Sequence, residues 1–296
     1  MSRKKKIAFI VNPVSGVGRK QYLRTYIDKY LDKNTYNYVV WHTKAPRHAT
    51  ELAKEAVALG VDVVVAVGGD GSVNEVSDGL RGSSAALAIL PLGSGNAFAT
   101  HWEISRRLPE AFHIINQQHF TYSDIGMVNA QLFVATAGLG FAAYVACQIR
   151  GKKIRGFMQY MYQAMRAAFT YQSKTYRFQL DESDVWLERK CYNFEVSNVK
   201  YYGYNVAIAP QADAEDGLLN VTLFLDRPRM VYIANLWRMF TNTIHKANFV
   251  ETYLAKSVTV VAPLQSPMHR DGEGELTSTG LLRFRAIPKA LKVIIK

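Results

Sequence analysis

Three glycine-rich turns, each directly after a short apolar run, constrain this chain more than any other feature of its sequence. The runs are Ile7–Val11, Val63–Val67 and Ala86–Leu90. The turns are Asn12-Pro13-Val14-Ser15-Gly16-Val17-Gly18, Gly68-Gly69-Asp70-Gly71-Ser72-Val73-Asn74-Glu75 and Pro91-Leu92-Gly93-Ser94-Gly95-Asn96. Apolar runs of this length between turn signals are typical of parallel strands that are covered on both faces.

Helical patterns lie between these runs. Arg19–Leu31 and Ala49–Leu59 repeat apolar residues at helix spacing, and Asn74–Leu80 begins a third helix. Tyr38–Trp41 is a further short strand. This alternation of strands and helices predicts an α/β domain with a parallel sheet between layers of helices.

After about residue 122 the apolar residues alternate with polar ones instead. The clearest examples are Tyr176–Asp181, Tyr192–Val196, Leu219–Leu225, Val258–Ala262 and Leu282–Ala286. A period of two is typical of half-buried antiparallel strands, which places Asn193 and Glu195 on the polar face. We therefore predict an α/β domain over residues 1–122 and an antiparallel β-sandwich domain over 123–296. A return of the C-terminal residues to the first domain is left open.

The glycine-rich turns suit phosphate groups. In open α/β sheets ligands bind beyond the carboxyl ends of the strands, which is where all three turns fall. Glycine permits positive φ and leaves backbone N–H groups bare, and a following helix adds a partial positive charge. Ser15, Ser72 and Ser94 add hydroxyl donors. One such turn is most often a tight turn only, but three at one sheet edge favour a phosphate site.

The full set of motifs resembles a known enzyme family. NPVSGVG, VGGDGSVNEV and PLGSGNAFA together are similar to the diacylglycerol kinase and sphingosine kinase superfamily. The second half continues the resemblance with Ile208-Ala209-Pro210, Ala212–Leu219 and Asp271-Gly272-Glu273. GGDG alone also occurs in NAD kinases and phosphofructokinases, so the ordered set carries the resemblance. It covers nearly the whole chain and implies an ATP-dependent lipid kinase.

The resemblance also implies roles for single residues. The residues implied to line the ATP site are Asn12, Ser15, Gly16, Thr43, Gly68, Gly69, Asp70, Gly71, Ser72, Val73, Asn74 and Ser94. The implied catalytic carboxylates are Glu273, as the general base, with Asp70, Asp271 and Asp124. The implied ligands of a structural Mg²⁺ are Asp213, Asp216 and the Leu218 carbonyl. The residues alone leave simpler interpretations open: hairpin turns at Glu273 and at Asp213–Gly217, and a turn between domains at Asp124.

The acceptor and the partners are less constrained. Ala97 stands where many bacterial diacylglycerol kinases carry Asp, which weakens a diacylglycerol assignment and leaves a sphingoid base open. A NAD-kinase-like nucleotide kinase is the enzymatic alternative. The second alternative is a catalytically silent membrane- or nucleic-acid-binding protein, because the formal net charge is +12. We find no aromatic-basic RNA-binding motif and expect no nucleic acid partner.

Two helical segments are candidates for contact with a membrane lipid. Gly156–Tyr171 and Arg229–His245 are rich in Met and aromatic residues with basic neighbours, which suits lipid contact. An ordinary core helix explains the apolar residues as well, and we favour the core. Leu132–Ile149, the longest apolar stretch, is interrupted by glycines and predicts strand, turn and helix.

The two cysteines give an indication of the cellular compartment of the protein. Cys147 and Cys191 are lone thiols in apolar or aromatic neighbourhoods, which indicates buried, reduced side chains. Together with the apolar stretch that is too interrupted to span a bilayer, this predicts a cytoplasmic protein peripheral to the membrane. A homodimer is left open.

Overall fold

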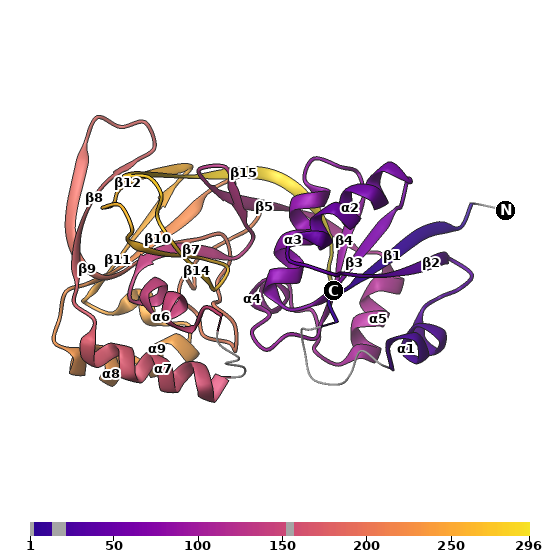
Figure 1. Ribbon diagram of the computed structural model, residues 1–296, viewed down its shortest axis with the longest axis horizontal. Coiled ribbons are helices and arrows are strands. Elements are labelled where there is room, and N and C mark those ends of the chain that lie inside the picture. Colours follow the sequence, from indigo (N-terminus) through magenta and orange to yellow (C-terminus); the bar gives the residue numbers. More distant parts are fainter. Residues whose placement is uncertain (1–2, 14–21, 152–156) are drawn as a thin grey trace. The chain divides into compact units, whose positions relative to one another are not determined.

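The computed structural model describes residues 3–13, 22–151 and 157–296 and divides the chain into two units (Figure 1). Unit 1 consists of Met1–Ser123 with Lys289–Lys296, and unit 2 of Asp124–Pro288. The last eight residues therefore pack with the first part of the chain.

Unit 1 is an α/β layer structure. Its elements are β1 (Lys5–Val11), α1 (Leu23–Tyr30), β2 (Tyr36–His42), α2 (His48–Ala58), β3 (Val63–Gly68), α3 (Asp70–Leu80), β4 (Ala86–Pro91), α4 (Ala97–His101), α5 (Leu108–Gln117) and the start of β5 (Phe120–Val128). The strands are parallel in the order β2–β1–β3–β4, and the end of β15 (Leu281–Ile294) adds a further parallel strand beside β4. The α/β prediction is confirmed.

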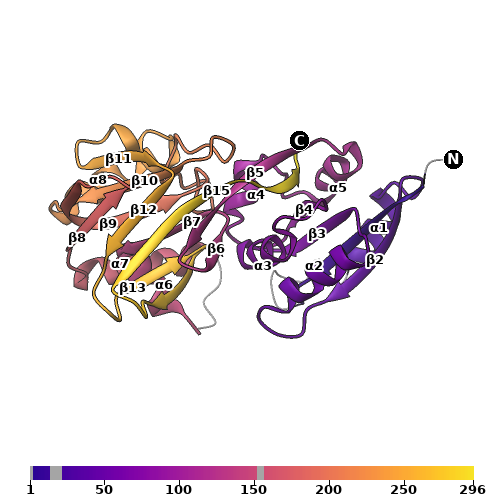
Figure 2. The same cartoon turned by 90° about the horizontal axis from the view of Figure 1, so that it is seen from above.

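The core of unit 1 explains the unbroken apolar runs. Every residue of β3 and β4 is buried, because helices cover both faces of the sheet. Alternate residues such as Phe9 and Val65 pack with α1 and α5, where Phe9 and Phe112 have ring centroids 6.1 Å apart. Helices α2 and α3 cover the opposite face (Figures 1 and 2).

The strand order also defines where a ligand can bind. Strand β1 lies between β2 and β3, so the chain leaves β1 toward one side of the sheet and continues from β3 toward the other. The carboxyl ends of β1 and β3 thus form a topological switch point, where open α/β sheets bind their ligands. Asn12 follows β1 here, and Gly69 and Asp70 follow β3.

Unit 2 is an antiparallel sandwich with helices. Its elements are the end of β5, β6 (Gln131–Phe133), β7 (Thr136–Gly140), α6 (Phe141–Ile149), α7 (Phe157–Thr170), β8 (Lys174–Leu180), β9 (Trp186–Ser197), β10 (Leu219–Leu225), α8 (Arg229–Asn235), α9 (Trp237–Phe240), a 3₁₀ helix (Ile244–Lys246), β11 (Val250–Ala255), β12 (Ser257–Val261), β13 (Pro267–Arg270), β14 (Glu273–Leu276) and most of β15. The strands pair in the order β14–β13–β7–β9–β8–β12–β15, with β10 also paired to β9 and β11 paired to β10. The sandwich prediction is confirmed.

Two sequence expectations are wrong in detail. Helix α3 begins at Asp70 and not at Asn74, so Gly71 and Ser72 lie in its first turn. Strand β9 is buried on both faces from Cys191 to Ser197, with Asn193 and Glu195 3% and 0% exposed. The second face is covered because Tyr202 and His269 pack against Glu195. The alternation of polar and apolar residues in the sequence does not show whether other parts of the chain cover the polar face of a strand.

The cysteines are both free. Cys191 is buried as expected, whereas Cys147 is half-buried, with its Sγ 3.3 Å from the Glu275 carbonyl oxygen. Burial raises the pKa of the Cys191 thiol to about 12, so this side chain is an unreactive part of the core. Within the described ranges, no helix is long and apolar enough to cross a membrane.

Candidate active site

Asp70 joins two of the glycine-rich turns. Its carboxylate accepts hydrogen bonds from the backbone N–H groups of Asn96, at 2.7 Å, and Ala97, also at 2.7 Å. The Gly68 carbonyl accepts two more, from Leu92 and Gly93, both at 2.9 Å. Because hydrogen bonds to a charged group are strong, Asp70 fixes the turn after β4 against the start of α3. The structure thus brings together the second and third of the predicted turns.

Glycine is needed in these turns for close approach. A Cβ on Gly93 would lie 2.2 Å from the Gly69 Cα, and a Cβ on Gly95 would lie 2.8 Å from an Asp70 carboxylate oxygen. Neither Gly69 nor Gly93 nor Gly95 has positive φ. The expectation that positive φ explains these glycines is therefore wrong, and backbone contact between the two turns is the reason.

The other residues implied for the ATP site lie around the same sheet edge. Asn12 is half-buried and its N–H points to the Val67 carbonyl at 3.4 Å, and the N–H of the buried Thr43 donates to Val11 at 2.9 Å. Ser94 is exposed in the turn after β4. Ser15 and Gly16 lie outside the described residues.

The first turn of α3 supplies the remaining implied residues, Gly71, Ser72, Val73 and Asn74. Val73 and Ser72 are buried, and the Ser72 Oγ has no hydrogen-bond partner among the described residues. Ser72, whose hydroxyl the sequence offers as a donor to a ligand, is 6% exposed. The amides of this turn remain the groups at the positive end of α3.

Arg106 is a residue that the sequence analysis missed. Its guanidinium donates to the carbonyl oxygens of Gly93, at 3.0 Å, and Ser94, at 2.7 Å, although the side chain is exposed. A positive charge therefore lies on the third turn. No local sequence signal marks it, since Arg106 lies twelve residues after Ser94 and reaches the turn only through the fold.

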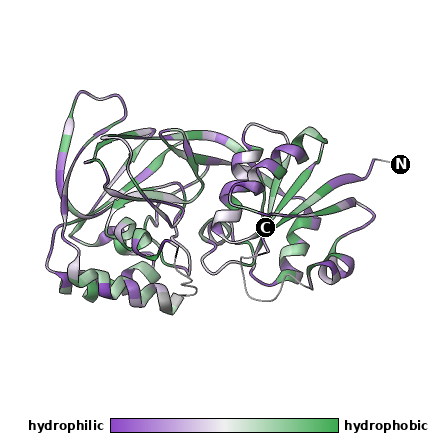
Figure 3. Ribbon diagram, viewed as in Figure 1, coloured by the Kyte–Doolittle hydropathy of each residue, from purple (hydrophilic) through white to green (hydrophobic). Residues whose placement is uncertain are grey.

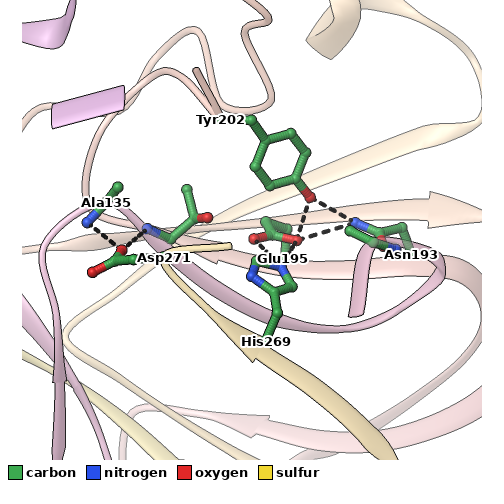
Figure 4. A network of polar contacts seen from close by, with 8 residues as sticks. Ala135, Asn193, Glu195, Tyr202, His269 and Asp271 are labelled. Atoms are coloured by element: carbon green, nitrogen blue, oxygen red, sulfur yellow. Dashed lines mark hydrogen bonds and ion pairs between the residues drawn. The ribbon is translucent and has the colours of Figure 1, made fainter. Parts of the chain in front are cut away.

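Asp271 anchors the hairpin that carries Glu273. Asp271 and Gly272 form its two-residue turn, with φ of 48° and 82°, a combination that Asp-Gly adopts readily. The Asp271 carboxylate accepts hydrogen bonds from three successive backbone N–H groups that precede or begin β7. The donors are Val134 at 2.9 Å, Ala135 at 2.8 Å and Thr136 at 3.0 Å, and Figure 4 shows the bond from Ala135. These bonds make Asp271 a positioning residue for the hairpin.

Glu273 is the first residue of β14 and is exposed, opposite Arg270 in the hairpin register. The hairpin packs tightly on α6, because a Cβ on Gly274 would lie 2.3 Å from the Cys147 nitrogen. Arg270 donates to the Leu132 carbonyl at 3.0 Å. Glu273 thus projects from a hairpin that is fixed on both of its flanks.

Asp124, Asp213 and Asp216 gather near the start of β10. Asp124 is fully buried and accepts a hydrogen bond from the Gly217 N–H at 2.6 Å. The Asp213 and Asp216 carboxylates accept local bonds from Glu215, at 3.0 Å, and Leu218, at 2.8 Å. Burial raises the pKa of Asp216, and the charges of Asp213 and Asp124 raise it further, although the Leu218 N–H acts in the opposite direction.

The donors near Asp216 fit a hard cation in chemistry. Carboxylate and carbonyl oxygens are the ligands that Mg²⁺ prefers, and a cation would relieve repulsion between neighbouring carboxylates. Across the described residues, no three His, Cys, Asp or Glu side chains are grouped as a metal site. The implied set has only two such side chains and one carbonyl, so Mg²⁺ here stays a proposal.

A buried polar network was not foreseen. Glu195 accepts hydrogen bonds from the Tyr202 hydroxyl and from Asn193, the latter at 3.2 Å (Figure 4). His269 Nε2 lies 3.0 Å from Glu195 Oε1, and both side chains are almost fully buried. Burial lowers the pKa of His269, but the charges of Glu195 and Asp271 outweigh it, so the net pKa is raised. The one sequence hint is Gly138 in β7, where a Cβ would lie 2.7 Å from the Glu195 carboxylate.

Comparisons with known proteins agree with this architecture. Residues 6–128 match the diacylglycerol kinase catalytic domain, and residues 135–295 match the YegS C-terminal NAD kinase beta sandwich-like domain. A probable lipid kinase YegS-like from Klebsiella pneumoniae (strain 342) is 28% identical over 82% of this chain and 81% of its own. A diacylglycerol kinase from Mycobacterium tuberculosis (strain ATCC 25618 / H37Rv) is 27% identical over 83% and 81%.

Solved structures share the whole fold. A diacylglycerol kinase from Bacillus anthracis str. Sterne covers 100% of this chain and 98% of its own, with 20% identity and a TM-score of 0.74. Another solved chain from the same organism reaches a TM-score of 0.82. Two consecutive family domains that together span most of the sequence place the chain in the family of diacylglycerol kinase-like and YegS-like lipid kinases. It is accordingly an ATP-dependent kinase.

Proposed function

We propose that the protein transfers the γ-phosphoryl group of ATP to a hydroxyl group of a lipid. The observation that carries the proposal is the joined pair of turns after β3 and β4, held by Asp70 and brought into backbone contact at Gly69 and Gly93. Small residues at the carboxyl ends of parallel strands, followed by a helix, let a phosphate chain approach backbone N–H groups.

The nucleotide would bind at the carboxyl ends of β1, β3 and β4. Asn12, Thr43, the segment 68–74 and Ser94 would line it, as would Ser15 and Gly16, which lie outside the described residues. Helix α3 has eleven residues, so its first turn offers the positive end of a helix dipole to phosphate oxygens. Arg106 adds a full positive charge on the third turn.

The chemical step is an in-line displacement at the γ-phosphorus. The lipid hydroxyl oxygen bonds to this phosphorus as the bond to the β–γ bridging oxygen breaks, and ADP leaves. Glu273 would accept the proton that the hydroxyl loses. Asp271 would take part by fixing the hairpin, since its carboxylate already accepts three backbone N–H groups.

Mg²⁺ would serve in two capacities. One ion would accompany ATP and neutralise charge on its phosphates. A second would be held by Asp213, Asp216 and the Leu218 carbonyl, with Asp124 beside them, and would stabilise the start of β10 by compensating their charges.

Ala97 influences which lipids are candidate acceptors. This residue is 2% exposed, and its N–H is bound by Asp70 at 2.7 Å. An aspartate at this position, as in many diacylglycerol kinases, would place a second carboxylate next to Asp70. With Ala97 this second carboxylate is absent, so the charge near the expected position of the acceptor hydroxyl differs. A sphingoid base is therefore included with diacylglycerol as a candidate acceptor.

A kinase assay tests the proposal. The protein and Mg²⁺-ATP are incubated separately with diacylglycerol, a sphingoid base, ceramide, phosphatidylglycerol and NAD, and the products are identified by mass spectrometry. We expect a phosphorylated lipid with wild type and none with Asp70→Asn, which should remain folded. Phosphorylation of NAD alone, or no ATP binding by calorimetry, would refute the proposal.

A further inference from the structure

The helices of unit 2 expose an apolar stripe where a core stripe was expected. On α7 the side chains of Met158, Tyr162, Met165 and Phe169 are 76%, 55%, 60% and 73% exposed. Their spacing of four, three and four residues places them on one face of the helix. The preference for an ordinary core helix is therefore wrong for this face, although Ala167, on the other face, is buried.

A second stripe follows the same rule on α8 and α9. Met230, Ile233, Trp237 and Phe240 are 69%, 55%, 54% and 52% exposed, with spacings of three, four and three residues. Leu236, between the two helices, has αR backbone angles, so the helical path is continuous from Arg229 to Phe240. Eight large apolar side chains in two ordered stripes are far more than the scattered exposed residues of an ordinary surface.

The two stripes belong to one side of the unit. Tyr171, directly after α7, and Tyr232 of α8 both pack on Tyr192 of β9, with ring centroids 5.3 and 4.4 Å from it. Figure 1 shows α7, α8 and α9 along the lower edge of this unit, and Figure 3 shows apolar residues along these helices. We call the eight side chains of the two stripes the apolar face.

The charges around the apolar face have one sign. Residues 157–171 and 227–249 contain no Asp or Glu. They contain the basic residues Arg166, Arg227, Arg229, Arg238 and Lys246. Arg166 lies 5.9 Å from the Tyr162 ring centroid and Arg238 lies 4.8 Å from that of Trp237. Cations held at the level of exposed aromatic rings match an interface where acyl chains meet anionic headgroups.

We propose that the apolar face docks the protein on the surface of an anionic phospholipid bilayer. The apolar side chains would enter the headgroup and acyl boundary, and the basic residues would contact headgroup phosphates. Tyr and Trp at such a boundary keep a polar atom toward water. The inference rests on the proposed function only in that a lipid acceptor resides in the membrane.

Sedimentation with lipid vesicles tests this docking without any turnover. Full-length protein is mixed with vesicles of phosphatidylcholine alone, or of phosphatidylcholine and phosphatidylglycerol in equal parts. We expect binding to the mixed vesicles, weaker binding to the neutral ones, and weakening by salt. The double variant Met165→Glu/Phe169→Glu should bind at least about tenfold more weakly, because two apolar side chains no longer enter the bilayer.

A matched control uses exposed apolar residues elsewhere in the same unit. Val185 and Leu264 are 62% and 64% exposed and lie outside the two helical segments. Val185→Glu/Leu264→Glu adds the same charge and should bind vesicles as wild type does. Circular dichroism checks that both double variants are folded, which their exposure predicts.

Phosphorylation assays separate docking from catalysis. Turnover of a short-chain diacylglycerol or sphingoid base dissolved as monomers should be equal in wild type and Met165→Glu/Phe169→Glu, whereas turnover of the long-chain lipid in vesicles should fall. Loss of both activities together with retained vesicle binding would contradict the docking role. So would equal vesicle binding by wild type and variant, or no binding by wild type. Dimerisation of wild type through this face, lost in the variant, would also overturn it.

Discussion

Replacing Asp271 by Asn separates a positioning role from direct participation in chemistry. The carboxylate accepts N–H groups of Val134, Ala135 and Thr136 at 2.8–3.0 Å. An amide has one acceptor oxygen and a donor NH₂ group, so at least one of these N–H groups faces a donor in the variant. Asn adopts positive φ as readily as Asp, so the turn itself is not strained by the change.

The expected cost follows from these bonds. Hydrogen bonds to a charged group contribute about 1.5–3 kcal/mol each, and losing the charge weakens all three. We expect Asp271→Asn to lower the free energy of unfolding by about 3 kcal/mol, measured by urea denaturation. Phosphorylation should fall by about a hundredfold, since a shift of about 1 Å in Glu273 suffices for that.

Asp181 supplies the matched control. It also has positive φ, and its carboxylate accepts the N–H groups of Lys256 and Ser257 at 2.8 and 3.0 Å. Both N–H groups bind the same oxygen, Oδ1, so Asp181→Asn should lower stability to a smaller extent, by loss of the charge alone, and leave phosphorylation unchanged. The positioning role would be refuted if Asp271→Asn lost activity while its stability was unchanged. It would also be refuted if excess Mg²⁺ restored the activity of Asp271→Asn.

Two further predictions concern the buried network and the nucleotide turns. The raised pKa of His269 means that its pairing with Glu195 stabilises the fold fully below about pH 6.5 and is lost as pH rises through the raised value. The stability difference between wild type and His269→Gln, measured by thermal unfolding at several pH values, should therefore shrink with rising pH; a constant difference would count against the pair. Gly93→Ala should separate the joined turns, because its Cβ would lie 2.2 Å from the Gly69 Cα, and should weaken ATP binding at least about tenfold in calorimetry. Gly280→Ala, where the nearest atom is 3.7 Å away, is its control, and equal affinities for ATP would disprove the requirement.

The sequence indicated much of the first unit because local pattern and burial coincide there. Runs such as Val63–Val67 are apolar at every position, and helices cover both faces of the sheet there. The turn residues were also recognisable, since Gly69 and Gly93 each follow closely on the end of a strand. Their physical reason was not, because two backbone segments some two dozen residues apart meet only in the fold.

The second unit was less predictable for the same physical reason. Periodicity shows that a helix or strand has two different faces, but not which face meets protein. The stripe of α7 has the spacing of a core stripe and is exposed, whereas Glu195 stands on the polar side of β9 and is fully buried. The Asp271 carboxylate binds amides at positions 134–136, and no local pattern encodes contacts over that separation.

Glu273→Gln tests the account most directly. This change keeps the size and the hairpin position of the side chain but removes the base, so the variant should bind Mg²⁺-ATP with unchanged affinity in calorimetry. It should also release no phosphorylated lipid above about one thousandth of the wild-type rate by mass spectrometry. Wild-type turnover by the folded variant, with any of the lipid acceptors, would contradict the account.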